Sequence, residues 1–434
     1  MTKPDQRPRL TTTDPTEFEN PYPAWHEARR DAPVFWDERL GYWQITRYED
    51  VISAVMNTRQ LSSEGFFALA KVHPGNEHLL PRGFEYAAPT LANADPPTHT
   101  RVRKLASGPF KPRRVAELES DIADIADELI DGFIAAGDCD LIEDFTVPLS
   151  LRTIAQILGM PASDIHEMRR YSDERPASLN PNLTTDEQAE LFEHYGTYYD
   201  FLENAIARRR QQPGNDLLSA LIATVDAPQE DSATLSETEL VSVVSTLIGA
   251  GNETTRYQIG NMMYALFHHP EQLAAVCADP TLASAAVEEA LRYFSSVKGN
   301  FRVATSDITF DDVTIPAGAL VQVCWASTGR DADIFDEPET FNIFRPDVNK
   351  HIAFSKGPHS CLGAPLARLE ATVALQRLLA RLPGLRLNRE PQYPADYVSG
   401  VQVQGLKRLH IAWDTPRSDQ DANGSNAEPG DAQQ

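Results

Sequence analysis

Cysteine and basic residues are both scarce in this 434-residue chain. The four cysteines, Cys139, Cys277, Cys324 and Cys361, lie far apart and form no C-x-x-C pair, which excludes a disulfide-rich secreted scaffold and a thiolate zinc site. Lys and Arg number 39 against 63 Asp and Glu, so the formal net charge is −24. This charge argues against nucleic acid as a partner, because phosphate backbones require a basic surface.

Long apolar runs are absent as well. Residues 1–15 contain no signal-peptide core, and no segment reaches the roughly 20 apolar residues that span a membrane. We therefore expect a soluble, cytoplasmic protein without membrane contact. Residues 415–434 contain almost nothing apolar, so burial cannot offset the entropy of ordering them, and we expect a disordered tail there.

What the sequence does contain is helical periodicity over most of its length. The main predicted helices cover residues 113–136, 186–211, 236–268, 281–294 and 366–379, with a shorter one at 49–56. Strands are predicted at 33–37, 41–46, 307–310, 313–315, 320–324 and 409–413. Because 41% of the residues are hydrophobic and no strong linker divides them, residues 20–414 are expected to form one domain after an extension at 1–19. The predicted fold class is mainly α with a smaller β region.

Residues 354–363, F-S-K-G-P-H-S-C-L-G, form the most informative stretch. They place Cys361 on a tight loop at the start of a predicted helix. Backbone N–H groups and a helix N-terminus favour a thiolate there, and a thiolate can bind a metal. A buried structural cysteine in a helix-capping loop is the alternative interpretation.

The long predicted helix at 236–268 has an unusual middle. Ser236 and Glu239 have capping-box spacing at its start, but residues 249–255, G-A-G-N-E-T-T, are a poor sequence for a helix interior. The Thr254 hydroxyl can bond back to the Ala250 carbonyl and locally open the helix, which leaves room for a small molecule or water. Close helix packing through small residues is the alternative.

These two segments, together with E-A-L-R at 289–292 and H-T-R-V-R at 99–103, resemble the cytochrome P450 family in their type and order. The resemblance implies the P450 fold, with haem b between the long central helix and the cysteine-loop helix. It makes Cys361 the axial iron ligand, Thr254 the residue that stabilises the oxygen being activated, and Glu253 the carrier of protons inward. The residues implied to contact the cofactor are His99, Arg103, Ala250, Arg302, Phe354, His359, Cys361 and Gly363.

The resemblance also implies a structural triad of Glu289, Arg292 and Arg345, which would hold the region of the cysteine loop. Two positions depart from the family pattern. Ser355 stands where glycine is usual, so a positive φ at this residue would carry a modest strain, and Gly329 replaces a commoner asparagine. Neither departure removes a ligand or a proton carrier.

The implied function is insertion of one atom of O2 into a small organic substrate, by hydroxylation, O-dealkylation or epoxidation. No fused flavin or iron–sulfur segment is seen, so electrons are expected from a separate ferredoxin or flavodoxin and its NAD(P)H reductase. The basic cluster from Arg101 to Arg114, with Lys356, is the expected docking patch, although it could equally be a solvated face. We expect a monomer. A haem-thiolate peroxygenase or coupling enzyme and a non-catalytic haem sensor remain alternatives.

The substrate pocket is expected to form from several separate segments of the chain. Lys298 and Gln402 suggest a polar contact with a carboxylate or hydroxyl of the substrate. The sequence does not identify the substrate itself. The expected pocket residues are Phe66, Leu91, Thr246, Gly249, Lys298, Gly299 and Gln402.

Overall fold

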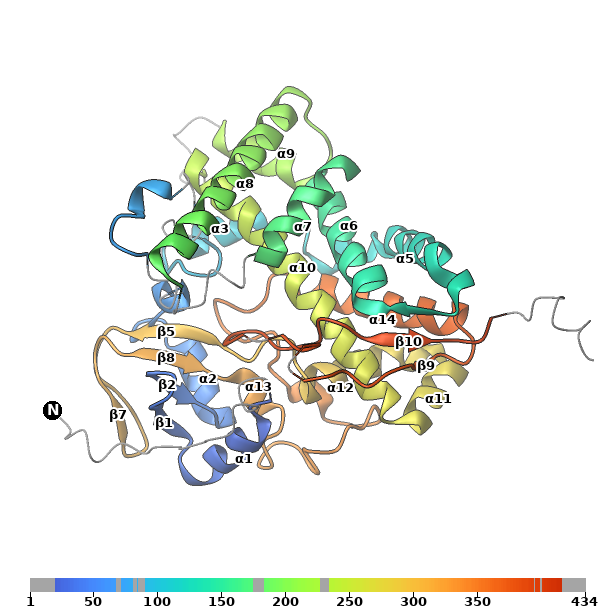
Figure 1. Cartoon of the computed structure of the whole chain (residues 1–434). Coiled ribbons are helices and arrows are strands. Elements are labelled where there is room, and N and C mark those ends of the chain that lie inside the picture. Colours follow the sequence, from blue (N-terminus) through green and yellow to red (C-terminus); the bar gives the residue numbers. More distant parts are fainter. Residues whose placement is uncertain are drawn as a thin grey trace, which may run out of the picture.

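Figure 1 shows the computed structural model, which describes residues 20–67, 72–80, 84, 90–174, 183–226, 234–393, 395–398 and 400–415. The predictions made for residues 1–19 and for the tail beyond Thr415 lie outside the described residues. Within those ranges, helices predominate and the strands are few and short, which confirms the mainly α class with a smaller β region.

Helices form most of the described structure, and several predicted ones begin and end within two residues of the observed bounds. The predicted helix at 113–136 is instead divided between α4 and α5 by a two-residue turn at Glu117 and Leu118. The prediction missed this turn because it leaves the helical spacing of apolar residues almost unchanged. The helices are α1 (Tyr22–Asp31), α2 (Tyr48–Met56), α3 (Thr98–Ala106), α4 (Pro112–Ala116), α5 (Glu119–Phe133), α6 (Val147–Leu158), α7 (Ile165–Glu174), α8 (Thr185–Gln211), α9 (Leu217–Val225), α10 (Glu237–Phe267), α11 (Pro270–Ala278), α12 (Ala283–Tyr293), α13 (Trp325–Thr328) and α14 (Ala364–Arg381).

The strands gather into one larger sheet and two small ones. The larger sheet has the order β1-β2-β8-β5-β3, with β2 and β8 parallel and the other pairs antiparallel. The small sheets have the orders β4-β10-β9 and β6-β7. The strands are β1 (Val34–Asp37), β2 (Tyr42–Ile45), β3 (Leu61–Ser62), β4 (Asp138–Asp140), β5 (Asn300–Ala304), β6 (Ile308–Phe310), β7 (Val313–Ile315), β8 (Leu320–Val323), β9 (Arg386–Leu387) and β10 (His410–Ala412).

Helix α10 runs through the middle of the molecule (Figure 1). Its predicted capping box is confirmed, since the Glu239 N–H donates to Ser236 Oγ at 3.1 Å and the Ser236 N–H donates to Glu239 Oε2 at 2.8 Å. Most of its residues are buried, and it packs against α6, α12 and α14. The glycine-rich middle of α10 is therefore enclosed by the helical core.

Strand β5 brings Arg302 to the edge of this core, although the sequence places that arginine ahead of the predicted strands. The side chain is buried, and Arg302 pairs with Val321 of β8. A five-residue strand with a buried arginine at its centre shows too little apolar pattern to be recognised in advance.

Candidate functional site

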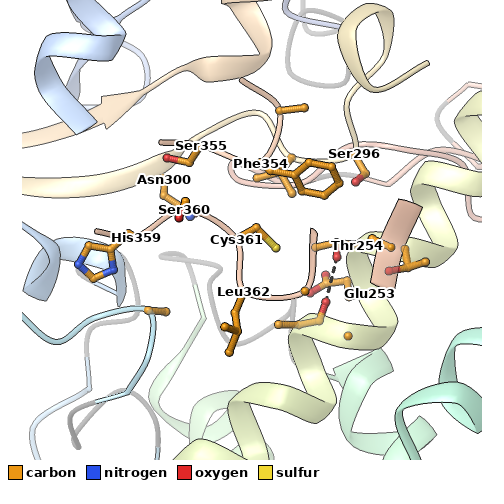
Figure 2. Close-up of a pocket in the computed structure, with 18 of the residues that line it drawn as sticks. Glu253, Thr254, Ser296, Asn300, Phe354, Ser355, His359, Ser360, Cys361 and Leu362 are labelled. Carbon is orange, nitrogen blue, oxygen red and sulfur yellow. Dashed lines mark hydrogen bonds between the residues drawn. The ribbon is translucent and has the colours of Figure 1, made fainter. Parts of the chain in front are cut away.

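The loop before α14 presents Cys361 to the interior. The Cys361 N–H donates to the Phe354 carbonyl at 2.8 Å, which closes the loop between them. Ser355 has a φ of 57°, so the modest strain expected for a positive φ at this residue applies, and Gly357 has a φ of 73°. A Cβ at Gly357 would lie 2.8 Å from Met56 Sδ, so α2 also restricts this position. In Figure 2 the Cys361 side chain points toward α10, with Phe354 and Leu362 on either side of it.

The middle of α10 faces this loop with Glu253 and Thr254. Thr254 Oγ1 donates to the Ala250 carbonyl at 2.9 Å, which confirms the predicted back-bond. Glu253 is 3% exposed, yet it lines the same cavity as Thr254 and Cys361. A buried acid and a hydroxyl on one helix therefore lie across a cavity from a thiol, as Figure 2 shows.

The cavity between the loop and α10 brings together most of the predicted site residues. Its lining also includes residues from α12 and a few single positions elsewhere, which sequence reasoning missed because each segment contributes only one or two side chains. The predicted residues that line it are Phe66, Leu91, Arg103, Thr246, Ala250, Glu253, Thr254, Arg302, Phe354, His359, Cys361, Gly363 and Gln402. Lining residues that were not predicted include Gln258, Val287, Leu291, Ser296 and Val403.

Four predicted residues are not among those that line the cavity: His99, Gly249, Lys298 and Gly299. His99 packs its ring against that of His359, with 3.9 Å between the ring centroids. Lys298 is buried and donates from Nζ to the Gly400 carbonyl at 2.8 Å. The sequence-based suggestion that Lys298 contacts a substrate carboxylate is therefore not supported, because its ammonium group is used within the fold.

Cationic and histidine side chains gather at one side of the cavity. Arg302 is 4% exposed, and burial lowers its pKa to about 10. Its guanidinium donates to the Phe301 carbonyl at 2.7 Å, while Arg103 donates to Ser360 Oγ at 3.3 Å. His359 Nε2 lies 2.9 Å from Ser63 Oγ, and burial, followed by the charge of Arg302, lowers the pKa of this imidazole to about 3. Such buried and half-buried donors are suited to binding an anion.

His99 supplies a second sign that this side of the cavity accepts a polar group. Its side chain is 1% exposed, and Nε2 makes no hydrogen bond to any residue in the described ranges. Buried polar atoms without partners are rare and call for a missing acceptor or donor. The two carboxylates of haem b are groups of the required charge, so the residues present fit this cofactor.

The thiol of Cys361 has a mixed electrostatic environment. The surrounding protein desolvates it, which raises its pKa, although the side chain is open to the cavity. The backbone N–H groups of Gly363 and Ala364 and the charges of Arg103 and Arg368 act in the opposite direction and favour the thiolate. A bound cation would complete this arrangement, because the thiolate is the form that ligates metals.

Glu289 and Arg292 form a fully buried ion pair on α12, as their i, i+3 spacing predicts. Arg292 Nη2 lies 2.6 Å from Glu289 Oε1, and Arg345 Nε lies 3.4 Å from Glu289 Oε2. Arg292 also donates to the carbonyls of Gly329 and Pro338. The three predicted residues are thus in contact, and the bonds from Arg292 to the carbonyls of Gly329 and Pro338 hold the segment that precedes the cysteine loop.

Comparisons with known proteins agree with this geometry. The sequence model of the family described as Cytochrome P450 matches residues 176–384. The chain is 38% identical to Cytochrome P450 107B1 of Saccharopolyspora erythraea over 381 residues, which cover 86% of this chain and 89% of that protein. It is also 38% identical to the vitamin D(3) 25-hydroxylase of Pseudonocardia autotrophica over 413 residues, covering 93% and 96% of the two chains.

A solved structure shows the same architecture. The crystal structure of CYP109E1 from Bacillus megaterium in complex with testosterone matches with a TM-score of 0.79 at 31% identity, covering 92% of this chain and 99% of that one. Among the described residues, no helix is both long and apolar enough to cross a membrane.

Proposed function

The chain belongs to the cytochrome P450 family of haem-thiolate monooxygenases, and from this premise we propose how its own residues bind haem b and assist the reaction. Bound haem b supplies the redox chemistry that activates O2, and a thiolate ligand favours cleavage of the O–O bond. The observation that carries the proposal is the shared cavity, in which Cys361 faces Glu253 and Thr254.

We propose that the Cys361 thiolate would bind the haem iron. The closed turn from Phe354 to Cys361 fixes the direction of the sulfur, and the N-terminus of α14 favours its anionic form. Arg103, Arg302, His99 and His359 are the proposed partners of the cofactor carboxylates. This assignment gives an acceptor to the buried Nε2 of His99 and to the sparsely bonded guanidinium of Arg302.

Thr254 and Glu253 are proposed to deliver protons on the opposite side of the cavity. The Thr254 hydroxyl donates its proton to the Ala250 carbonyl, so its oxygen is free to accept a hydrogen bond from a group in the cavity. Glu253 lies next to it on the same helix and is shielded from bulk water. A hydroxyl and an acid placed in this way can pass protons one at a time while the site excludes solvent.

We propose a neutral, mainly apolar organic substrate that is hydroxylated on an unactivated carbon. Leu247, Val287, Leu291 and Val297 offer apolar contact area in the cavity. Ser296 and Asn300, labelled in Figure 2, offer uncharged polar atoms that suit a hydroxyl or carbonyl. The relative named for vitamin D(3) and the structure bound to testosterone support this class.

Electrons are proposed to come from a ferredoxin or flavodoxin that docks beside α4. Of the predicted basic cluster, Arg101 is paired with Glu239 and Arg103 faces the cavity, so these two do not contribute a free surface charge. Lys104, Lys111, Arg113 and Lys356 are exposed, and α4 packs against α14, the helix that follows Cys361. We call these four residues the basic surface. Their charge complements a small acidic protein.

The proposal is tested by turnover in 18O2 with an accepted steroid-like substrate, a ferredoxin or flavodoxin, its reductase and NADPH. Substrates are first chosen by their shift of the haem absorption band. The expected product gains one labelled oxygen atom, while the second atom appears in water. A product whose oxygen comes from water, or turnover with peroxide but none with O2, would refute the monooxygenase reaction.

A further inference from the structure

Three ionisable side chains near the cysteine loop, Glu288, His351 and Arg368, are joined by hydrogen bonds and are given no role in the proposed function. Glu288 on α12 accepts hydrogen bonds from Arg368 on α14 through both carboxylate oxygens, at 2.5 and 3.1 Å. On its other side, Glu288 Oε2 lies 2.8 Å from His351 Nε2. One carboxylate therefore joins two residues that flank the loop in sequence.

The contacts of His351 determine its tautomer. Nδ1 accepts the backbone N–H of Ala353 at 3.2 Å, so Nδ1 carries no proton. The ring proton is then on Nε2, which donates to Glu288. Burial raises the pKa of Glu288, but the bonds from His351 and Arg368 outweigh it and lower this pKa to about 2. Glu288 is accordingly a carboxylate with two fixed donors.

Arg368 connects this carboxylate to the cysteine loop. Its guanidinium carbon lies 4.6 Å from the centre of the Phe354 ring. The Phe354 carbonyl in turn accepts the N–H of Cys361 at 2.8 Å. The Arg368 side chain is 40% exposed, so its contacts with Glu288 and Phe354 are what hold the guanidinium in one place.

We propose that Arg368, held by Glu288 and His351, is a positioning residue that sets the electrostatic field at the Cys361 sulfur and so tunes haem reduction. The inference rests on the proposed role of Cys361 as the iron ligand. A positive charge near the thiolate stabilises the added electron, so it makes the reduction potential less negative. Glu288 and the Phe354 ring hold this charge next to the cysteine loop.

The test is a redox titration of the haem-loaded protein and its Arg368→Gln variant, which removes the charge but keeps a polar side chain. At the wild-type midpoint, we expect the ratio of reduced to oxidised protein to fall about threefold to tenfold; a tenfold change is 59 mV for one electron. The matched control is Arg377→Gln, because Arg377 lies on the same helix with 36% of its side chain exposed and is paired with Asp127. Its midpoint should equal that of the wild type.

Variants of His351 test the positioning itself, since they leave the Arg368 charge in place. His351→Leu removes the donor to Glu288, and the midpoint should shift in the same direction as for Arg368→Gln but by less. His351→Gln restores an N–H donor and should return the midpoint toward the wild-type value.

Three outcomes decide the matter. Equal midpoints for Arg368→Gln and Arg377→Gln would overturn the role of Arg368. A shift in Arg368→Gln with none in His351→Leu would overturn the role of His351. If the carbon monoxide spectrum of the wild type lacked the thiolate signature, ligation of the iron by Cys361 would be refuted. That result would be a failure of the proposed function, and the spectrum detects it independently of the redox titration.

Discussion

At the residue scale, the reaction depends on a few polar side chains that the fold keeps away from water. Thr254 is the simplest to test, because its only described hydrogen bond is to the Ala250 carbonyl and its replacement disturbs little else. Thr254→Ala should lower the yield of product per NADPH about tenfold or more and divert reduced oxygen to peroxide, since positioned proton transfer contributes about 10²–10⁴-fold.

Thr254→Ser is the matched control, because it retains the hydroxyl, and it should keep most of the coupling. The measurement is the ratio of product and of hydrogen peroxide to NADPH consumed. Unchanged oxygen use and product yield in Thr254→Ala would contradict the proton-delivery role of Thr254.

Glu370 on α14 gives a prediction about pH. It is 1% exposed, and burial raises its pKa to about 8, although a hydrogen bond with Ser150 opposes the shift. A carboxyl with a raised folded-state pKa binds its proton more tightly in the folded protein. Its stabilising contribution is therefore complete below the unfolded pKa near 4.5 and is lost as pH rises to about 8.

Glu370→Gln should remove this loss of stability with rising pH. The difference in unfolding temperature between the variant and the wild type should therefore shift in favour of the variant from pH 5 to pH 8. Glu271→Gln, which alters an exposed carboxyl on α11, is the control and should follow the wild type. Thermal unfolding of the haem-loaded proteins across this pH range measures the effect. Parallel curves for Glu370→Gln and the wild type would show that Glu370 is ionised in the folded state.

At the scale of elements, the loop from Phe354 to Cys361 combines two residues with positive φ. Ser355 has a φ of 57° and a buried Oγ without a hydrogen bond to the described residues, so Ser355→Gly should stabilise the protein by about 1 kcal/mol. Gly357→Ala should do the opposite, because φ is 73° at this residue and a Cβ there would lie 3.1 Å from the Val55 carbonyl. Denaturant unfolding compares the pair, and a destabilised Ser355→Gly would mean that the serine hydroxyl has an important partner.

The same loop illustrates what a sequence can and cannot reveal about local structure. The Thr254 back-bond to Ala250 could be predicted, because a threonine hydroxyl in a helix can reach the carbonyl four residues earlier. The expectation for Ser355 rested instead on the resemblance to a family in which glycine is usual at this position. The bond between Lys298 and a backbone carbonyl could not be predicted. Whether a cationic side chain faces a cavity or a backbone carbonyl depends on which distant segments pack beside it. Here Lys298 donates a hydrogen bond to the Gly400 carbonyl.

At the scale of the whole molecule, charge is distributed unevenly. The chain has a net charge of −24, yet Lys104, Lys111, Arg113 and Lys356 form the exposed basic surface. Long-range attraction to an acidic electron donor is screened beyond about 8 Å at 0.15 M salt and about 3 Å at 1 M. Reduction by a ferredoxin should therefore slow about tenfold or more between low and high salt.

Replacing both Lys111 and Arg113 by Glu should reduce this rate at low salt and flatten its salt dependence. Lys407→Glu is the control, because Lys407 is exposed on the segment before β10. Stopped-flow reduction under carbon monoxide measures the rate. Reduction that is independent of salt in the wild type would contradict docking on the basic surface.

The most direct measurement for the central claim, that Cys361 is the thiolate ligand of haem b, is the absorption spectrum of the reduced, carbon monoxide-bound protein. The wild type should show the strongly red-shifted Soret band of a thiolate-ligated haem, and Cys361→His should lose that shift while it still binds haem. Absence of the shifted band in freshly prepared, haem-loaded wild type, or its persistence in Cys361→His, would contradict the assignment.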